Sequence, residues 1–280
     1  MVSGRGEYRS TMDADIWSSA SLADRFADDV SASAKGYVRT YVLHHHLLER
    51  LPPPPAPVLD VGGGAGHQSF PLAEAGYDVT LLDSSTAMLD KARQRLPQLS
   101  AQARRRVTLV LADGEKAEDA MNGRRFAAVL CHGVLGYLEP EPLIEQLCRC
   151  TRAGGVVSIM AGNAATMAVR PALERRWDDA LASFDETSGD IKELGVHGQS
   201  HTVDEVSEHL RGHGVEPLGW YGTWLWVDQL EFSGVDLASI DSRELSAMAE
   251  VELEASRRDP YRQLSRAFHV LGRKGPAGQR

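Results

Sequence analysis

Two aspartates and a run of glycines are the residues of this sequence best suited to bind a ligand. The run reads VLDVGGGAG from residue 58 and contains the pattern Asp60-x-Gly62-x-Gly64-x-Gly66. Glycines let a chain that leaves a strand turn sharply and bring its backbone close to a ligand. Asp83 follows seventeen residues after Gly66, at the end of the next apolar run. Its carboxylate is positioned to accept hydrogen bonds from both hydroxyls of a ribose.

The spacing of the glycines distinguishes two classes of adenosine cofactor. A dinucleotide site uses G-x-G-x-x-G, whose third glycine lets the helix pack on the strand under a pyrophosphate. Here the third position is His67 or Ser69, depending on the register, so the pattern fails. An anion at Asp60 would repel a pyrophosphate but can pair with an ammonium group, which S-adenosylmethionine carries. We therefore predict an S-adenosylmethionine site that includes Asp60, Gly62, Gly64, Gly66 and Asp83.

The elements around these residues alternate between strand and helix. The five predicted strands cover residues 58–61, 77–83, 107–111, 126–131 and 156–160, and the helices between them cover 67–76, 84–96 and 142–152. Strands that alternate with helices of about a dozen residues form a parallel sheet. The sequence therefore predicts an α/β fold with a mononucleotide-binding unit at its start.

Two further polar residues follow strands of this predicted sheet. Because the carboxyl ends of neighbouring parallel strands meet at one crevice, Asp113 is positioned to reach the exocyclic amine of an adenine. A loop aspartate that caps a turn is an equal alternative. His132 follows the fourth strand and is the best single candidate to touch both cofactor and substrate. It would act either as a general base or through a hydrogen bond to the cofactor.

The segments before and after the glycine unit are predicted to close the site. Residues 14–27 and 36–51 read as helices that cap the crevice. Lys35 and Arg39 would then approach the carboxylate of the methionine moiety. The alternative for both residues is a position on a solvated helix face. After the fifth strand, a long polar segment suggests an active-site lid. A helix over 203–212 and strands from 214 and over 267–270 follow, with Trp224 and Trp226 on one face of a strand.

Composition excludes several classes of protein. The chain has 280 residues, 42% of them hydrophobic and 25% charged, and no apolar run long enough to span a membrane. No signal-peptide core is visible, so a cytoplasmic protein is expected. The net charge of −9 opposes broad binding to a phosphate backbone. Cys131, Cys148 and Cys150 are expected to be buried free thiols. The histidines at 44–46 suggest a helix with one inward imidazole and imply no metal site.

Several motifs beyond the glycine loop are more specific. With VLDVGGGAG they are AKGYVR at 34–39, LCHGVLGYL at 130–138, a Gly-Asn-Ala turn at 162–164 and RRDPYRQLSRAFHVLGRK from residue 257. Together they resemble the class I S-adenosylmethionine-dependent methyltransferases, and among these the bacterial tRNA 5-carboxymethoxyuridine methyltransferase family. The resemblance implies a Rossmann-like fold with a mostly parallel seven-stranded sheet and helices on both faces. It also implies cofactor contacts from Arg39, Gly62, Gly63, Asp83, Ala112, Asp113 and His132.

The same resemblance suggests how the chain is divided. Residues 1–51 would form an N-terminal helical cap, 52–162 the cofactor-binding core, 163–201 a lid inserted after the fifth strand, and 202–280 the completion of the sheet. Tyr137, Trp177, His197 and His201 are candidates to line an acceptor pocket. The sequence leaves the oligomeric state open.

The acceptor is the least constrained part of the prediction. The resembling family esterifies a carboxymethoxy group on a tRNA, but the segment FDETSGD at 184–190 would make an acidic lid that repels an anticodon stem. A small molecule that is methylated on oxygen, for example on a carboxylate, or on nitrogen is therefore the first hypothesis. The alternatives are a tRNA enzyme with a basic patch at Arg170, Arg175 and Arg176, a cofactor-binding protein without turnover and, least supported, a nicotinamide oxidoreductase.

Overall fold

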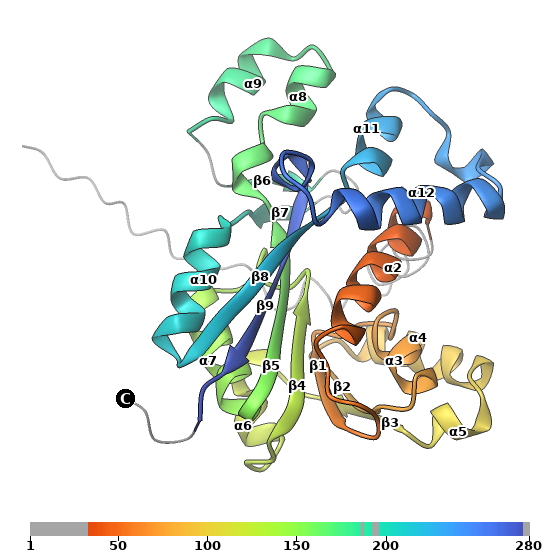
Figure 1. Ribbon diagram of the computed structural model, residues 1–280, viewed down its shortest axis with the longest axis vertical. Coiled ribbons are helices and arrows are strands. Elements are labelled where there is room, and N and C mark those ends of the chain that lie inside the picture. Colours follow the sequence, from red (N-terminus) through yellow and green to blue (C-terminus); the bar gives the residue numbers. More distant parts are fainter. Residues whose placement is uncertain (1–32, 186–187, 192–195, 277–280) are drawn as a thin grey trace, which may run out of the picture.

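A seven-stranded sheet forms the centre of the computed structural model, which describes residues 33–185, 188–191 and 196–276 (Figure 1). Its strands are β1 (Pro57–Val61), β2 (Asp78–Asp83), β3 (Val107–Leu111), β4 (Phe126–His132), β5 (Thr151–Gly162), β8 (Val215–Thr223) and β9 (Ala267–Lys274). They lie in the order β3-β2-β1-β4-β5-β9-β8. The helix expected over 14–27 lies outside the described residues.

Within this sheet, β9 is the strand that runs against the others. β1 pairs in parallel with β2 and β4, β2 with β3, and β4 with β5. β9 is antiparallel to both of its neighbours, so β8 points the same way as β5. The predicted mostly parallel seven-stranded sheet is thus confirmed. The carboxyl ends of β1, β2 and β4 meet at one edge, where a doubly wound sheet binds its ligand.

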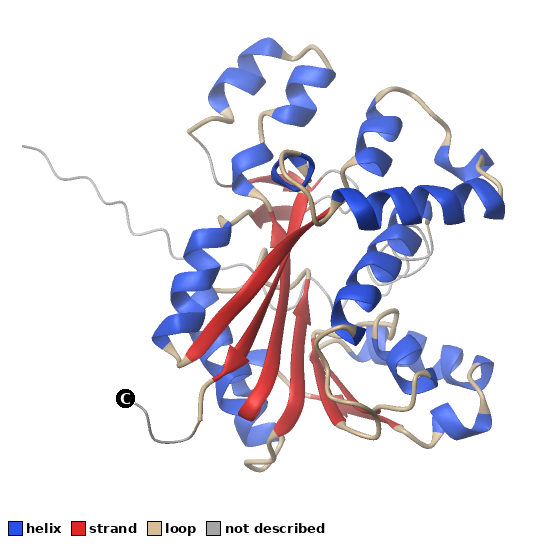
Figure 2. Ribbon diagram, in the orientation of Figure 1, coloured by secondary structure: helices blue, strands red, loops and turns tan. Residues whose placement is uncertain are grey.

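Helices cover both faces of the sheet (Figure 2), as expected. They are α2 (Ala34–Leu48), α3 (Ser69–Glu74), α4 (Thr86–Arg95), α5 (Ala101–Arg104), α6 (Ala117–Ala120), α7 (Pro140–Cys150), α8 (Val169–Leu173), α9 (Trp177–Ala182), α10 (Val203–Gly212), α11 (Trp226–Phe232) and α12 (Ser242–Ala255). The helices α6, α7 and α10 pack on one face, and α2, α3 and α5 pack on the other.

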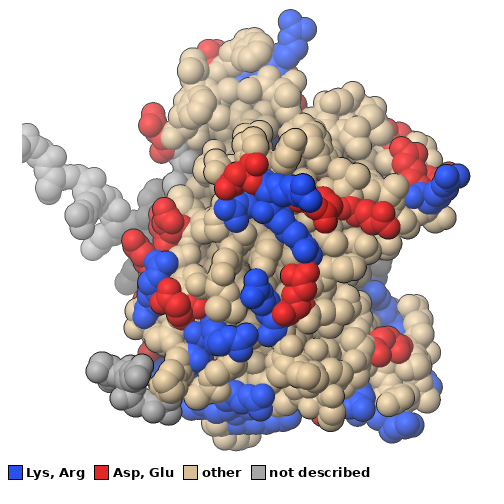
Figure 3. All heavy atoms as spheres, viewed as in Figure 1, with Lys and Arg blue, Asp and Glu red and all other residues tan. Residues whose placement is uncertain are grey.

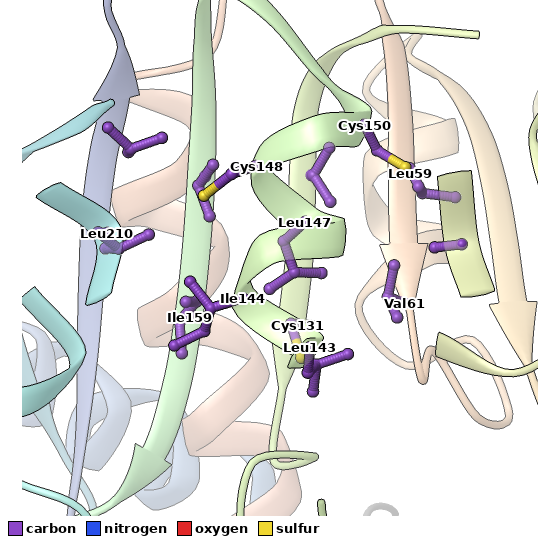
Figure 4. Close-up of a cluster of buried hydrophobic side chains, with 14 of the residues drawn as sticks. Leu59, Val61, Cys131, Leu143, Ile144, Leu147, Cys148, Cys150, Ile159 and Leu210 are labelled. Carbon is purple, nitrogen blue, oxygen red and sulfur yellow. The ribbon is translucent and has the colours of Figure 1, made fainter. Parts of the chain in front are cut away.

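Strand alternation divides the chemistry of the sheet between these two faces. Toward the carboxyl ends of β1, β4 and β5, the odd-numbered residues enter an apolar cluster with α7, which includes Leu59, Val61, Cys131, Leu143, Ile144, Leu147, Cys148, Cys150 and Ile159 (Figure 4). The three cysteines are buried free thiols, as predicted. Because successive residues of a strand point to opposite faces, Asp60, His132 and Ser158 belong to the face that α2 covers.

The boundary between α7 and β5 differs from the prediction. The helix begins at Pro140 and ends at Cys150, and β5 starts at Thr151, five residues before the predicted start of the strand at 156. Pro140 suits a first helical turn because a proline needs no hydrogen-bond partner for a backbone N–H there. At the other end the Thr151 hydroxyl donates to the carbonyl of Leu147 (2.8 Å) and closes the helix without a glycine.

The prediction that Trp224 and Trp226 share one strand face is wrong. β8 ends at Thr223, Trp224 has a positive φ of 64°, and Trp226 is the first residue of α11. A side-chain carboxylate far along the chain makes this helix start possible: the Glu252 carboxylate on α12 accepts hydrogen bonds from the backbone N–H groups of Leu225 (3.1 Å) and Val227 (2.7 Å). No local sequence signal reveals such a cap.

The N-terminal helix α2 joins the sheet to these late helices. Val38 and Val42 of α2 form one apolar cluster with residues of α11 and α12, and Leu43 packs on β5 and β9. His46 is fully buried, as the single inward imidazole predicted for the histidine run. Within the described residues, no helix is both long and apolar enough to cross a membrane. The cytoplasmic location stays a prediction.

The segment after β5 forms a small separate layer above the sheet edge (Figure 1). It contains α8, α9 and an antiparallel pair of short strands, β6 (Ser188–Ile191) and β7 (Val196–Gln199). The segment returns to its origin, because Asn163 bridges His201, and the Gln199 N–H donates to the carbonyl of Gly136 (2.9 Å). Its role as a lid stays a prediction.

Candidate active site

The glycine loop after β1 is tied to the end of β2. The backbone N–H groups of Gly62 and Gly63 both donate to the carbonyl of Leu82, at 2.8 and 3.2 Å. Gly62 has a φ of 70°, and a Cβ atom there would collide with the side chain of Val134. Only glycine adopts such a conformation at no steric cost. The loop therefore leaves its backbone facing the crevice, as the spacing predicted.

Asp83 stands at the end of β2, under this loop. One carboxylate oxygen accepts a hydrogen bond from the Gly64 N–H and the other from the Ser85 N–H, both at 2.8 Å. Burial raises the pKa of Asp83, and these two backbone hydrogen bonds act in the opposite direction. Each carboxylate oxygen has a further lone pair, so both oxygens can accept one more hydrogen bond from a ligand.

Asp60 and Arg39 bring opposite charges to the same cavity. Asp60 is 2% exposed, and its carboxylate accepts a hydrogen bond from the Ser69 hydroxyl (2.6 Å). Burial raises the pKa of Asp60 to about 6, against the effects of Ser69 and Arg39. Burial likewise lowers the pKa of Arg39 to about 10, while Asp60 acts to raise it. Both groups are held with little water around them, which strengthens their pull on a charged ligand.

A cavity of about 220 Å³ lies between the glycine loop, α2 and the end of β4. Of the predicted site residues it is lined by Arg39, Asp60, Gly62, Gly63, Gly64, Asp83, Asp113 and His132. Gly66 and Ala112 are not among its lining residues. A Cβ atom on Gly66 would lie 2.6 Å from the ring of Phe70, so this glycine lets the loop pack on α3. Ala112 packs against the apolar cluster of the opposite face.

Asp113 caps a turn, which is one of its two predicted roles, and the contact with an adenine amine stays a prediction. Its carboxylate accepts a hydrogen bond from the Glu115 N–H (3.0 Å) and caps a short 3-10 turn at Gly114–Lys116. It also lines the cavity, on the β3 side. A capping aspartate held in place by its own turn can therefore still present its second oxygen to a ligand.

His132 ends β4 and forms part of the cavity wall. Its Nε2 atom lies 2.8 Å from the hydroxyl of Ser158. Burial, followed by the charges of His269 and Arg39, lowers the pKa of His132 well below its usual range. The imidazole is therefore neutral at physiological pH and is a weak base.

Several other candidates occupy positions that the sequence did not indicate. Lys35 does not line the cavity: its ammonium group pairs with Asp228 (2.5 Å) and Glu231 (2.9 Å) of α11. Tyr137 does line it. His201 instead lies 3.1 Å from the carbonyl of Leu135 through Nε2. Trp177 does not line the cavity and is 61% exposed. The side chain of His197 lies outside the described residues, so its candidate role stays a prediction.

Sequence reasoning missed part of the lining. Thr40, Leu43, His67, Gln68, Met88, Glu115, Val134 and Leu138 also face the cavity. Gln68 is 8% exposed, and neither its amide nitrogen nor its amide oxygen has a hydrogen-bond partner among the described residues. A ligand or an ordered water in the cavity can supply the partners that this amide lacks. Its position beside the glycine loop is the one sequence signal for this role.

The chain is similar in sequence and in fold to known methyltransferases. A family model described as a methyltransferase domain matches residues 59–157. The tRNA 5-carboxymethoxyuridine methyltransferase of Escherichia coli K12 is 26% identical over 275 residues, covering 90% of this chain and 94% of that protein. The trans-aconitate 2-methyltransferase of Delftia acidovorans is 30% identical over 201 residues, covering 61% and 74%. The crystal structure of a putative S-adenosylmethionine-dependent methyltransferase from Listeria monocytogenes aligns with a TM-score of 0.56 at 18% identity, covering 85% and 99%.

The sheet order, the glycine loop and these matches define a Rossmann-like methyltransferase. The chain belongs to the class I S-adenosylmethionine-dependent methyltransferases. It is an enzyme of that class, and S-adenosylmethionine is its methyl donor. Within the class it is similar along nearly all of its length to the Escherichia coli tRNA enzyme. A nicotinamide oxidoreductase and a binding protein without turnover are not supported.

Proposed function

We propose that this methyltransferase transfers the methyl group of S-adenosylmethionine to a carboxylate of a small molecule. The observation that carries the proposal is the weakness, as bases, of the two imidazoles that line the cavity. Burial lowers the pKa of His67 to about 3 and that of His132 well below its usual range. Neither imidazole can readily remove a proton from a hydroxyl or an ammonium group at neutral pH. A carboxylate needs no such step, because its oxygen is already a nucleophile.

The two relatives support the same acceptor chemistry. Both are named for acceptors that contain a carboxyl group, a 5-carboxymethoxyuridine in tRNA and trans-aconitate. Their names differ in the size of the acceptor, one a nucleic acid and the other a small acid. Carboxylate methylation is therefore the property that the proposal takes from both of them.

The residues around the cavity fit the methyl donor in a specific orientation. Asp83 would accept hydrogen bonds from the ribose hydroxyls, and Asp113 would accept one from the adenine amine. Asp60 would face the ammonium group of the methionine moiety, and Arg39 its carboxylate. The amide of Gln68 would donate to that carboxylate and accept from that ammonium group, which would satisfy both of its unpartnered atoms.

The chemistry then consists mainly of alignment. S-adenosylmethionine supplies an activated methyl group on a sulfonium centre, and the acceptor oxygen must lie in line with that bond. Leu43, Val134 and Leu138 give the cavity apolar walls that exclude water from the acceptor. Holding two reactants in this geometry lowers the barrier without any proton transfer.

A small acceptor is favoured over tRNA by the charges near the segment after β5. Arg170 pairs with Glu174 (2.9 Å), and Arg176 pairs with both Glu174 and Asp179. Two of the three arginines of the predicted basic patch are therefore paired with carboxylates, while the third, Arg175, is exposed. Basic and acidic side chains are also mixed over the face shown in Figure 3.

A tRNA acceptor is the second candidate, because the alignment with the Escherichia coli tRNA enzyme covers 94% of that protein. The test presents the purified protein with isotope-labelled S-adenosylmethionine and either a panel of small carboxylic acids or bulk bacterial tRNA, at low and moderate salt. Base-labile label on a small acid is the expected result. Salt-sensitive label on tRNA, with none on any acid, would contradict the small-molecule proposal and favour the second candidate.

A further inference from the structure

The two edges of the seven-stranded sheet are protected to different degrees. β8 forms one edge and β3 the other (Figure 1). β8 contains Pro217, which has no backbone N–H, and its pairing with β9 is irregular between Pro217 and Gly219. Arg262 also donates a hydrogen bond to the carbonyl of Trp220 (3.0 Å) on this strand. A proline and a bulge at an edge hinder the pairing of a further strand there.

β3 has none of these features. Its sequence is VTLVL from Val107 to Leu111, without a proline, a glycine or a charged residue. Leu111 is 57% exposed, and Thr108 is exposed as well. Among the described residues, no strand pairs with β3 on the side away from β2. An open apolar edge of this kind can pair with a strand of another chain.

Alternation along β3 shows which backbone groups are directed to this open side. The carbonyl of Arg106 and the N–H of Ala112 are both hydrogen-bonded to backbone groups of β2, at 2.8 and 3.1 Å. In a strand, the backbone groups of successive residues point to opposite neighbours, so the even-numbered residues face β2. The N–H and C=O groups of Val107, Leu109 and Leu111 therefore face outward, where a paired strand would satisfy them.

The charges that flank β3 have opposite signs at its two ends. Arg104 and Arg105 precede the strand; both are exposed, and no carboxylate of the described residues pairs with either. Asp113 and Glu115 follow the strand. Burial, and then the like charges of Asp113 and Glu139, raise the pKa of Glu115, so this end has an excess of negative charge. A strand that begins basic and ends acidic is complementary to a copy of itself in the antiparallel direction.

We propose that the open edge of β3 is a docking surface for the β3 edge of a second copy of this chain. A two-fold axis at Leu109 places Val107 opposite Leu111 of the partner subunit. Each such pair exchanges two N–H···O bonds, because the backbone groups of these residues all face outward. The same register brings Arg104 and Arg105 to the acidic end of the partner strand. The two sheets then form one continuous sheet.

A second copy fits this edge better than an unrelated peptide. In a two-fold pair the same surface serves both chains, so every contact of the strand and of its charged ends occurs twice. The exposed side chain of Leu111 would lie next to Val107 of the partner subunit, which removes apolar surface from water. The pairing does not depend on which acceptor the enzyme methylates.

Sedimentation of the full chain over a wide range of concentrations tests the pairing. The wild type is expected to reach twice the mass of the 30.5 kDa chain. Leu111→Lys places a charge at the open edge and should weaken association at least about tenfold, because symmetry makes each substitution act twice. Arg105→Glu sets like charges opposite each other and should weaken association about tenfold, with a larger effect at low salt. Because Arg105 is exposed, its variant tests the interface even if Leu111→Lys does not fold.

Leu218→Lys and Arg152→Glu are the matched controls. Leu218 is 38% exposed on β8, the opposite edge, and Arg152 is an exposed arginine near the start of β5. Both variants should associate like the wild type. A chain that stays monomeric up to the limit of its solubility would overturn the proposal. So would a dimer that Leu218→Lys disrupts and Arg105→Glu does not.

Amide hydrogen exchange distinguishes strand pairing from any other contact between two copies. In the dimer, the outward N–H groups of Val107, Leu109 and Leu111 should exchange slowly, like those of the even-numbered residues bonded to β2. In the Arg105→Glu protein at low concentration, the outward groups should exchange much faster while the others stay protected. Equal exchange in dimer and monomer would mean that the copies meet elsewhere, for example at Leu181 of α9, which is 68% exposed, and would overturn the proposal.

Discussion

The two faces of the central sheet differ in chemistry although the same strands make both. On the face covered by α6, α7 and α10, the strands contribute an apolar cluster with no charged member (Figure 4). On the face covered by α2, the alternate residues of those strands include Asp60, His132, Ser158 and, from β9, His269. The strand period of two lets one segment serve stability and chemistry separately. Substitutions on the two faces should therefore have different consequences.

The largest effect is expected on the apolar face. Leu147→Ala removes a fully buried side chain from the cluster, and it should lower the free energy of unfolding by about 2 to 5 kcal/mol. Denaturant unfolding measures this loss. Affinity of the folded protein for S-adenosylhomocysteine should not change, because the residue does not line the cavity. A large loss of affinity with intact stability would mean that the faces are not independent.

Asp83→Ala tests the opposite face. It removes a carboxylate that we expect to bind the ribose, so affinity for S-adenosylhomocysteine should fall by about 1.5 to 3 kcal/mol in isothermal titration. Asp78→Ala is the control: this residue begins the same strand, and its carboxylate is 48% exposed and pairs with Arg106. Equal effects of the two substitutions would show that the ribose assignment is wrong.

Arg39 and Lys35 separate cofactor binding from packing on a single helix. Arg39→Ala should weaken S-adenosylhomocysteine binding by about 1 to 2 kcal/mol, because a charge-assisted hydrogen bond to the carboxylate is lost. Lys35→Met, one turn earlier, breaks the pairs with α11 and should lower stability while affinity is retained. If the Arg39 variant binds S-adenosylhomocysteine as the wild type does, α2 has a purely structural role.

The smallest effect is a dependence on pH. The pKa of Asp60 is raised from 3.8 to about 6 by burial, so the folded protein prefers the neutral acid and loses stability as the pH rises through this range. An ammonium group prefers the ionised form, so affinity for S-adenosylhomocysteine should fall a few-fold as the pH drops below about 6. Asp60→Asn should bind with little pH dependence there and should gain most in stability over wild type near pH 7. A pH profile shared by both proteins would assign the titration to another group.

The parts of the site that the sequence predicted depend on local chain geometry. Gly62, Gly64 and Asp83 lie within one strand-turn-helix-strand unit, where residue types alone restrict the backbone. His269 could not be found in this way, since its partner Ser158 is brought close only by the insertion of β9 beside β5. The pairing of Lys35 with Asp228 likewise depends on helices that are distant in sequence.

In the fold, too, the elements set by local sequence could be predicted, and those set by distant contacts could not. The alternation of strands and helices predicted the sheet, and its order and direction agree with the family resemblance. The helix α11 was missed because its first N–H groups are capped by Glu252, a residue of another helix. Trp224 could not be assigned from propensity either, because a positive φ is rare for a bulky side chain and reflects tertiary constraint.

The antiparallel insertion of β9 also sets an order of events during synthesis on the ribosome. Among the described strands, β8 pairs only with β9, which follows more than forty residues later, from Ala267. Until that strand emerges, β8 has no hydrogen-bond neighbour and β5 has an open edge. His269 arrives on the same strand. A nascent chain that has already formed the glycine loop therefore still has an incomplete sheet beside β5.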